Sequence, residues 1–349
     1  MRAALIDRFD ADVPVVEVPD PICPEDGVVV SVDACGVCRS DHHAWKGVDP
    51  DVVLPHVMGH ELAGEVDEVG PACGRFRVGQ RVTVPFILGC GRCADCKAGR
   101  ATVCGSQQVI GFTIWGAFAE RIAIPHADAN LVALPDEIDA VAAAALGCRV
   151  TTAWRALTDR GALQAGEWLV VHGAGGVGLS AIMLADALGA RTIAVDVSAD
   201  ALDAARRLGA AGVVDAGSVD NVGAAVRELT DGGAHVSVDA LGITTTFDNS
   251  LRSLRRLGRH VQVGMPVGDH ATVSLPLLEL IYARQLSLHG MRGLDAGGFS
   301  SLLGLVAAGR FDPARLVGRT IGLSGAEAAL REMDGTPPPG ITVIDDLTG

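Results

Sequence analysis

The chain has 349 residues, enough for two domains that each bury a hydrophobic core. Its formal charge of -14 argues against a nucleic-acid surface, where basic residues must neutralise phosphates. Although 49% of the residues are hydrophobic, no uninterrupted apolar run is long enough to span a bilayer. Nine cysteines and an N-terminus without the apolar core of a signal peptide favour a reducing cytoplasm.

The first part of the chain, up to about residue 85, predicts short strands separated by proline and glycine turns. The runs rich in β-branched residues lie at residues 13–18, 28–33, 61–70 and 80–84. We therefore expect an all-β lobe at this end of the chain.

A dense cysteine stretch follows, with intervals of three, three and eight residues. Its members are Cys90, Cys93, Cys96 and Cys104. The C-x-x-C steps let neighbouring thiolates converge on one ion, and Gly91 and Gly99 permit the tight turns between them. A disulfide pair or four unrelated thiols is the alternative, but this spacing is crowded for bridges. The stretch predicts a closed structural zinc lobe at about residues 88–106, which performs no chemistry.

Beyond about residue 150 the pattern changes to alternating apolar strands and helical segments. Strands are predicted at residues 167–172, 192–196, 213–214, 235–239, 260–263 and 286–289. Such alternation indicates βαβ units and a parallel sheet covered on both faces. From about residue 290 the chain reads as irregular, and we expect this tail to return to the first lobe.

A glycine-rich segment lies between the first of these strands and an alanine-rich helix. Its members are Gly173, Gly175, Gly176, Val177 and Gly178. A tight turn without a ligand is the alternative, but Asp196 ends the next strand, where a carboxylate can bind both ribose hydroxyls. Because that carboxylate would repel a 2′-phosphate, and because residues 197–199 provide no cation, the segment predicts NAD rather than NADP.

Three further polar stretches, at residues 35–43, 59–61 and 147–152, suggest a second metal site. Cys38, His60 and Cys148 would provide two thiolates and an imidazole and leave one position open, as in a catalytic zinc site. Spacing alone does not show that residues so far apart meet, and buried free cysteines are the alternative.

Together these motifs resemble the zinc-containing alcohol dehydrogenases of the medium-chain dehydrogenase/reductase superfamily. G-V-C-R-S-D, G-H-E, the four-cysteine spacing and G-C-R-V-T-T-A carry the resemblance, which covers nearly the whole chain. It implies an α/β protein with a GroES-like, β-rich catalytic domain (residues 1–149 and 289–349) and a Rossmann-type, doubly wound parallel-sheet domain (residues 150–288).

The resemblance also assigns roles around the second metal. It makes Cys38, His60 and Cys148 the ligands of the catalytic zinc. Asp41 resembles the carboxylate that orients His60, and Glu61 resembles the acid that can approach the metal during ligand exchange.

A proton relay is implied in the same way. Ser40 resembles the hydroxyl that accepts the alcohol proton, and His43 resembles the outer end of the relay to water. His42 is expected to be a solvated neighbour, with an exchange of roles between the two histidines left open.

For the cofactor, Arg39 resembles the arginine that binds the pyrophosphate, and Val263 the residue beside the nicotinamide carboxamide. Two departures affect cofactor binding. Relatives often carry an arginine where this chain has Ile341, so Arg39 or Arg292 would have to supply the charge. Met291 stands where many relatives have a small residue near the nicotinamide ribose.

Two tryptophans are candidates for the substrate pocket. Trp45 corresponds to an aromatic at the pocket in relatives, with packing in the lobe core as the alternative, and Trp115 is the second candidate. Cys23, Cys35 and Cys73 are expected to be packing residues.

The resulting hypothesis is an NAD-dependent, reversible oxidation of a primary or secondary alcohol to an aldehyde or ketone, with two zinc ions per chain. A small-molecule substrate, no nucleic-acid or membrane partner, and a homodimer or homotetramer are expected. Polyol and formaldehyde-type dehydrogenases of the same superfamily are alternatives. The cysteines argue against its zinc-free reductases. A non-catalytic scaffold with structural zinc only is the alternative of a different class.

Overall fold

The computed structural model describes residues 1–335 and 337–348 and divides into two compact units. Unit 1 comprises Met1–Thr151, Gly293–Gly304 and Asp312–Gly349, and unit 2 comprises Thr152–Arg292 and Leu305–Phe311. The domain boundaries expected near residues 150 and 288 stay predictions. No helix among the described residues is both long enough and apolar enough to cross a membrane.

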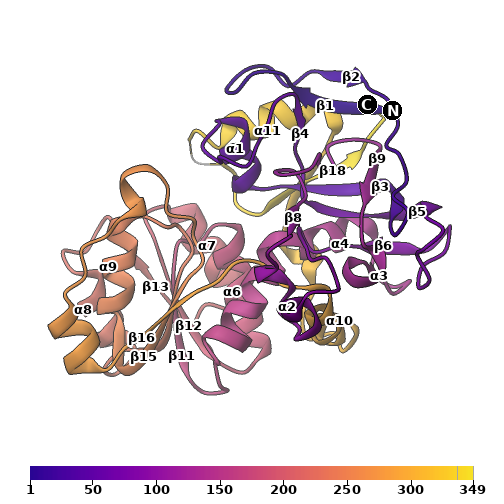
Figure 1. Cartoon of the computed structure of the whole chain (residues 1–349). Coiled ribbons are helices and arrows are strands. Elements are labelled where there is room, and N and C mark those ends of the chain that lie inside the picture. Colours follow the sequence, from indigo (N-terminus) through magenta and orange to yellow (C-terminus); the bar gives the residue numbers. More distant parts are fainter. Residues whose placement is uncertain (336, 349) are drawn as a thin grey trace. The chain divides into compact units, whose positions relative to one another are not determined.

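Unit 1 is built on a seven-stranded sheet (Figure 1). Its strands, in spatial order, are β10 (Val132–Ala133), β6 (Arg81–Thr83), β5 (Glu61–Val69), β3 (Val28–Val37), β18 (Ile341–Asp346) and β17 (Val317–Gly322), while β9 (Arg121–Ile124) also pairs with β3. The long strand β3 is buried over most of its length, which explains its run of valines. Strand β3 lies near the centre of the sheet and ends directly before Cys38.

Shorter elements complete this unit. Strand β1 (Arg2–Ile6) pairs with β2 (Val15–Glu17) and β4 (His56–Val57), and β7 (Ile87–Leu88) pairs with β8 (Gln108–Val109). The helices are α1 (Arg39–Trp45), α2 (Ala94–Lys97), α3 (Ala127–Asn130), α4 (Ala140–Ala145) and α11 (Ala326–Glu332), and α10 (Phe299–Ala307) begins in this unit. The 3-10 and π-helical turns of this unit are η1 (Ala101–Val103), η2 (Leu146–Val150), η6 (Ala296–Gly298), η7 (Pro313–Leu316) and η8 (Leu323–Gly325). The turns η3 (Ala156–Arg160), η4 (Gly268–Ala271) and η5 (Leu277–Tyr282) belong to unit 2.

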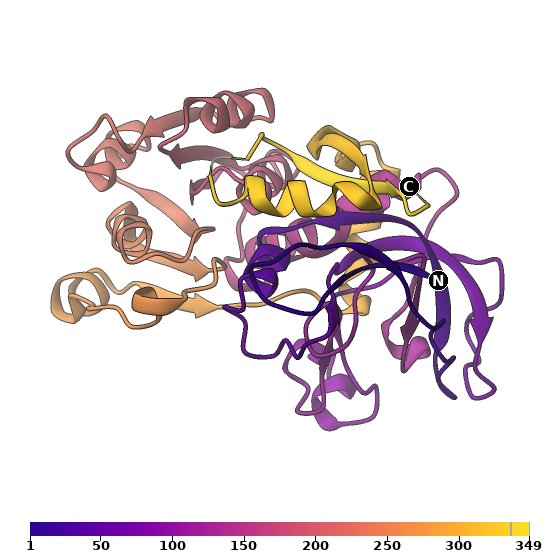
Figure 2. The same ribbon diagram turned by 90° about the horizontal axis from the view of Figure 1, so that it is seen from above.

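The expectation of an irregular tail was wrong. After residue 290 the chain forms α10, β17, α11 and β18, short elements whose signals are obscured by the glycines and prolines that separate them. Strand β18 pairs antiparallel with β3, with Ile344 opposite Cys35, so the end of the chain does return to the first lobe. Figure 2 shows this yellow segment beside the indigo and violet strands of the N-terminal part.

Unit 2 contains the predicted parallel sheet, which is confirmed. Its six strands, in spatial order, are β13 (Gly212–Asp215), β12 (Arg191–Asp196), β11 (Trp168–His172), β14 (Ala234–Asp239), β15 (Leu254–Gln262) and β16 (Ser287–Gly290). Helices α6 (Gly176–Ala187) and α7 (Ala199–Arg207) cover one face, and α8 (Val222–Leu229) and α9 (Thr244–Arg252) cover the other (Figure 1). Helix α5 (Thr151–Arg155) leads into this unit. This order places the first strand next to the point where the chain reverses direction across the sheet, where dinucleotides bind in such folds.

Candidate metal and cofactor sites

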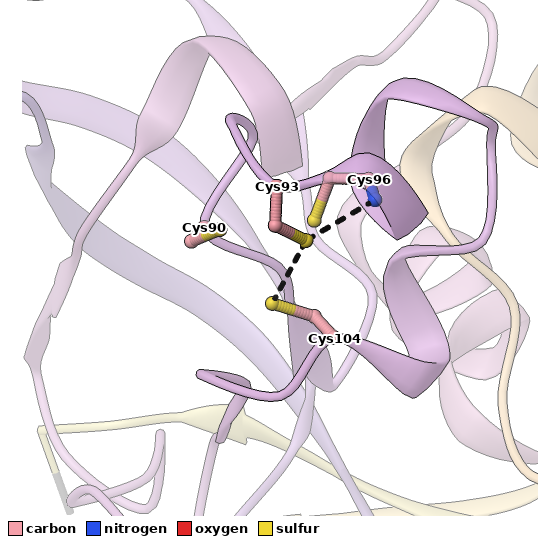
Figure 3. A group of neighbouring side chains, drawn as sticks. All are labelled: Cys90, Cys93, Cys96 and Cys104. Carbon is pink, nitrogen blue, oxygen red and sulfur yellow. Dashed lines mark hydrogen bonds between the residues drawn. The ribbon is translucent and has the colours of Figure 1, made fainter.

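The four cysteines of residues 90–104 form one cluster. Their sulfur atoms all lie within 4.8 Å of one another, and Figure 3 shows the side chains turned toward a common centre. The Cys93 and Cys104 sulfurs are 3.8 Å apart, far beyond the length of about 2 Å of a disulfide bond, and all nine cysteines of the chain are free thiols. The geometry therefore fits four thiolates around one tetrahedrally coordinated ion better than a disulfide bond.

Backbone groups around this cluster point toward its sulfurs. The Cys96 amide donates to the Cys93 sulfur at 3.4 Å, and the Ser106 amide donates to the Cys104 sulfur at the same distance. Amides of Arg92 and Cys93 lower the pKa of the Cys90 thiol to about 6. A Cβ atom at Gly89 would lie only 2.8 Å from the Cys96 sulfur, so this glycine makes room for the cluster. N–H groups that donate to a sulfur stabilise its thiolate form, which is the form that binds a metal ion.

A second cluster is assembled from three separate segments of unit 1. Cys38 lies between the end of β3 and the first turn of α1, and His60 directly precedes β5. Cys148 lies in η2, beside a break in helical geometry at Gly147 (φ -45°, ψ -128°). Together with Glu61, these residues place their potential ligand atoms within 4.8 Å of one another. The structure thus brings together the three residues that spacing alone could not connect.

The buried carboxylate of Asp41 holds this cluster in position. Its Oδ1 lies 2.8 Å from Nδ1 of His60 and accepts from the Gly59 amide at 3.0 Å. Its Oδ2 accepts from the Cys38 amide at 2.8 Å and so also caps the start of α1. One side chain therefore fixes the backbone of one candidate ligand and the imidazole of another.

The other ring nitrogen of His60, Nε2, is buried and has no hydrogen-bond partner among the described residues. The rings of Phe86 and Phe112 pack edge-on against the imidazole, with centroids 5.6 and 5.3 Å away. A buried polar nitrogen without a partner is costly unless a ligand satisfies it. The cluster therefore fits a zinc ion, bound through Nε2 while Asp41 accepts the Nδ1 hydrogen.

The two thiols of the cluster influence each other electrostatically. A hydrogen bond from Cys148 lowers the pKa of the Cys38 thiol well below its usual value, against the opposing effect of burial. The positive charge of Arg149 acts in the same direction on Cys38. The site thus favours at least one thiolate, the form that binds metals.

Sequence reasoning missed the partner of Glu61. The Arg149 backbone amide and Nε donate to Oε1 of Glu61 at 3.0 and 3.1 Å, and Nη2 of Arg149 contacts Oε2. Burial raises the pKa of Glu61, and Arg149 opposes that rise. An arginine directly after a ligand cysteine, in a stretch that is otherwise small and apolar, was the available signal, because a buried charge needs a counter-ion.

Ser40 and His43 lie on α1, three residues apart and therefore on the same side of that helix. The Ser40 hydroxyl is 3.9 Å from the Cys38 sulfur, so it borders the cluster. Nδ1 of His43 is buried without a partner among the described groups, and burial lowers the pKa of this histidine. His42 is buried rather than solvated, and its Nε2 lies 2.9 Å from the carboxylate of Asp334.

Of the two tryptophans, Trp45 has no exposed surface and its indole N–H donates to the Ala11 carbonyl at 2.7 Å. This burial favours the core-packing alternative for Trp45. Trp115 is 39% exposed and donates to the Pro55 carbonyl at 3.1 Å. Among the remaining cysteines, Cys35 is fully buried in the core of unit 1.

In unit 2 the glycine-rich segment connects β11 to α6. Gly173 has a left-handed backbone (φ +95°), and a Cβ atom at Gly178 would lie 1.9 Å from the Gly173 carbonyl oxygen. Both positions thus require glycine, whereas the space where a Gly175 Cβ would stand is open. Free amides at the start of a twelve-residue helix, next to open space, fit a pyrophosphate.

Asp196 ends β12 and is tied to this loop. Its Oδ2 accepts from the Ala174 amide at 2.7 Å, and its Oδ1 accepts from the amides of Val197 and Ser198. The nearest cation on α7, Arg206, is exposed and paired with Asp203. The described residues next to the carboxylate therefore offer no cation for a 2′-phosphate.

Two other cofactor candidates follow neighbouring strands of the unit 2 sheet. Val263 and Met291 follow β15 and β16, and their amides donate to Asp239 and Gln262 carbonyls. In unit 1, the Arg39 guanidinium donates to the Met333 carbonyl.

Comparison with known proteins agrees with both halves of this picture. Residues 24–136 match the alcohol dehydrogenase GroES-like domain, and residues 176–308 match the zinc-binding dehydrogenase family. An alcohol dehydrogenase of Geobacillus stearothermophilus is 34% identical over 285 residues, which cover 80% of this chain and 82% of the relative. An NAD-dependent alcohol dehydrogenase of Sulfurisphaera tokodaii is 32% identical, with 99% of both chains covered.

A solved structure extends the comparison to three dimensions. The alcohol dehydrogenase TADH from Thermus sp. ATN1 superposes with a TM-score of 0.91 at 30% identity, covering 99% of each chain. The fold, the two family matches and the relatives agree with one another. The chain belongs to the zinc-type alcohol dehydrogenases of the medium-chain dehydrogenase/reductase superfamily.

Proposed function

We propose that the chain catalyses the reversible, NAD-dependent oxidation of a primary or secondary alcohol at a zinc ion held by Cys38, His60 and Cys148. The observation that carries the proposal is the buried Nε2 of His60, which has no partner among the described residues, in a cluster whose potential ligand atoms, including both thiol sulfurs, lie within 4.8 Å of one another. A second zinc, held by the four cysteines of residues 90–104, would be structural.

The chain's own residues would prepare and orient the reacting groups. When bound, zinc supplies a Lewis acid that lowers the pKa of the substrate hydroxyl, and NAD supplies the hydride acceptor. Asp41 keeps the proton of His60 on Nδ1, which leaves Nε2 free to bind the metal. The surrounding Phe86 and Phe112 rings exclude water from this side of the imidazole.

The alcohol proton would leave along α1. Ser40 borders the metal cluster and would accept this proton, and His43, one helical turn later, would pass it outward. The lowered pKa of His43 supports this role, since a neutral imidazole is ready to take up a proton at neutral pH. His42 is already engaged by Asp334, which favours His43 for the relay.

For cofactor choice, the Asp196 carboxylate would accept hydrogen bonds from the ribose hydroxyls of NAD. NADP would place a phosphate beside that carboxylate without a nearby cation, which is electrostatically unfavourable.

The proposal is tested by metal analysis together with an activity panel. We expect two zinc ions per chain, and oxidation of some alcohols from a panel of primary, secondary, aromatic and vicinal-diol substrates, with NAD preferred over NADP. One zinc per chain and no turnover with any panel member would instead support a non-catalytic scaffold. Formaldehyde with glutathione is included so that a formaldehyde-type activity is detected.

An oligomer is also proposed, from the edge of the unit 2 sheet. Strand β16 pairs only with β15 among the described strands, and Leu277, Leu278 and Tyr282, in the segment just before it, are 62%, 74% and 77% exposed. An unpaired edge next to exposed apolar side chains is a typical association surface. Light scattering after size-exclusion chromatography should give a dimer or tetramer, and a monomer would contradict this.

A further inference from the structure

The ion pair between Glu61 and Arg149 joins residues 88 positions apart in the sequence and is sealed from water. Glu61 has no exposed surface and Arg149 is 6% exposed. Both carboxylate oxygens are engaged, Oε1 by two N–H groups and Oε2 by Nη2 of Arg149. The planar guanidinium therefore holds the carboxylate in a single orientation, which a lysine could not do.

Two glycines provide the space for this pair. A Cβ atom at Gly36 would lie 2.4 Å from Oε2 of Glu61, and one at Gly147 would lie 2.5 Å from Cβ of Glu61. Any larger residue at either position would displace the carboxylate. The compartment is thus built around one position of Glu61.

That position matters because Glu61 is itself a potential ligand. Its carboxylate is one of the four groups whose donor atoms lie within 4.8 Å of one another, next to Cys38, His60 and Cys148. Four protein ligands would close a tetrahedral zinc site, whereas three leave the open position that catalysis needs. Something must therefore keep Glu61 out of the ligand set.

We propose that Arg149 is a positioning residue that withholds Glu61 from the metal, so that the site keeps three protein ligands and one open position. The inference rests on the proposed zinc site and adds a residue that sets its coordination number.

The test uses the full-length protein with Co²⁺ in place of the second-cluster zinc, because cobalt absorption reports the ligands directly. R149A removes the side-chain contacts to both oxygens and leaves only the backbone amide of residue 149 on Oε1. The carboxylate can then turn toward the metal, so we expect a changed cobalt spectrum and a rise in the alcohol KM of about tenfold, the loss of about 1.4 kcal/mol of binding. The double variant R149A/E61Q removes the competing ligand. It should return the cobalt spectrum to that of the wild type and lower the alcohol KM from the R149A value.

Two further variants keep the test decisive. R149K keeps the charge but not the two-pronged contact, so it should show the same changes as R149A to a smaller degree, and it substitutes for R149A if that variant does not fold. R155A, which removes another arginine paired with an acid, is the matched control and should leave the cobalt spectrum unchanged.

Opposite results have distinct meanings. If R149A and R149K leave the spectrum and KM unchanged, or if E61Q fails to reverse their changes, Arg149 has only a structural role and the inference is wrong. If the wild-type chain takes up no cobalt at Cys38, His60 and Cys148, the proposed function itself fails, and the inference fails with it.

Discussion

The two cysteine clusters of unit 1 are opposite solutions to the problem of holding a metal ion. The cluster of residues 90–104 takes all its ligands from one short stretch, in which Cys93 and Cys96 are only partly buried. The second cluster takes its ligands from three segments separated by more than twenty residues each, and is buried against phenylalanine rings.

The comparison shows how function follows from construction. A cluster within one short segment forms when the turns of that segment bring its four cysteines together. It can then bind an ion with four thiolates and hold its own loop in place. A cluster assembled by the whole sheet can place non-ligand groups around the metal, here Asp41, Ser40 and the Glu61–Arg149 pair. Only the second kind can leave a position open and still keep the surrounding groups in order.

The largest effect is expected from breaking the second cluster. Cys148→Ser should remove one zinc per chain and lower kcat by roughly 10⁴-fold, since the Lewis acid contributes several kcal/mol to catalysis. Metal analysis and initial rates provide the measurement. Cys23→Ser, at a partly buried cysteine outside both clusters, is the control and should retain both ions. Full activity in Cys148→Ser would remove the second cluster from the reaction.

Breaking the first cluster should act on stability instead. Cys104→Ala should release the other zinc and lower the free energy of unfolding by more than about 4 kcal/mol, because loss of a structural metal is among the most damaging changes. Thermal or urea unfolding measures this. Cys73→Ala serves as the comparison outside the clusters. A variant that keeps its stability but loses turnover would reverse the roles assigned to the two sites.

A smaller effect is expected from Asp41→Asn, which changes no ligand. A neutral amide is a weaker acceptor for the Nδ1 hydrogen of His60 than the charged carboxylate. Metal affinity at the second cluster should therefore fall by about 10- to 100-fold, with the first cluster unaffected. Competition with a chelator measures the affinity. Asp128→Asn, which alters a carboxylate bonded to the Gly74 and Arg75 amides, should leave both affinities unchanged.

The smallest effect is on the pH dependence of stability, and it concerns unit 2, away from both clusters. Burial lowers the pKa of His172, in unit 2, to about 3. The unfolded chain therefore binds a proton below about pH 6.5 that the folded chain refuses, and the free energy of unfolding falls as the pH drops toward 3. Between pH 6.5 and pH 5 the loss is about 2 kcal/mol. His172→Gln should flatten this decline in denaturant titrations. An equally steep decline in the variant would assign it to other groups, among them His260, whose pKa burial also lowers.

How far the sequence predicts each site follows from how local the site is. The spacing of Cys90 to Cys104 and the glycines before α6 belong to single segments, so their patterns are readable directly. The meeting of Cys38 with Cys148 depends on how β3 and η2 pack, so the residue types suggested it as a possibility and the family resemblance assigned the ligands.

Other features were missed, for physical reasons. The pairing of Arg149 with Glu61 arises from tertiary contact, and arginine is usually found at the surface, so its burial was not expected. The burial of Trp45 depends on the neighbouring β1 region, where Ala11 accepts its N–H. The tail after residue 290 was misread because short strands next to glycines and prolines give weak signals.

The pairing of β18 with β3 has a consequence for synthesis on the ribosome. The strand that leads to Cys38 is bordered along residues 35–37 by residues 342–344, which are translated long after β3 and after the whole sheet of unit 2. Until β18 is made, this edge of β3 therefore has hydrogen-bonding groups without their final partner, while the contiguous sheet of unit 2 can already form. The nascent chain thus leaves the edge at Cys35–Val37 open until β18 has been made, and a truncation before residue 341 would leave it permanently uncovered.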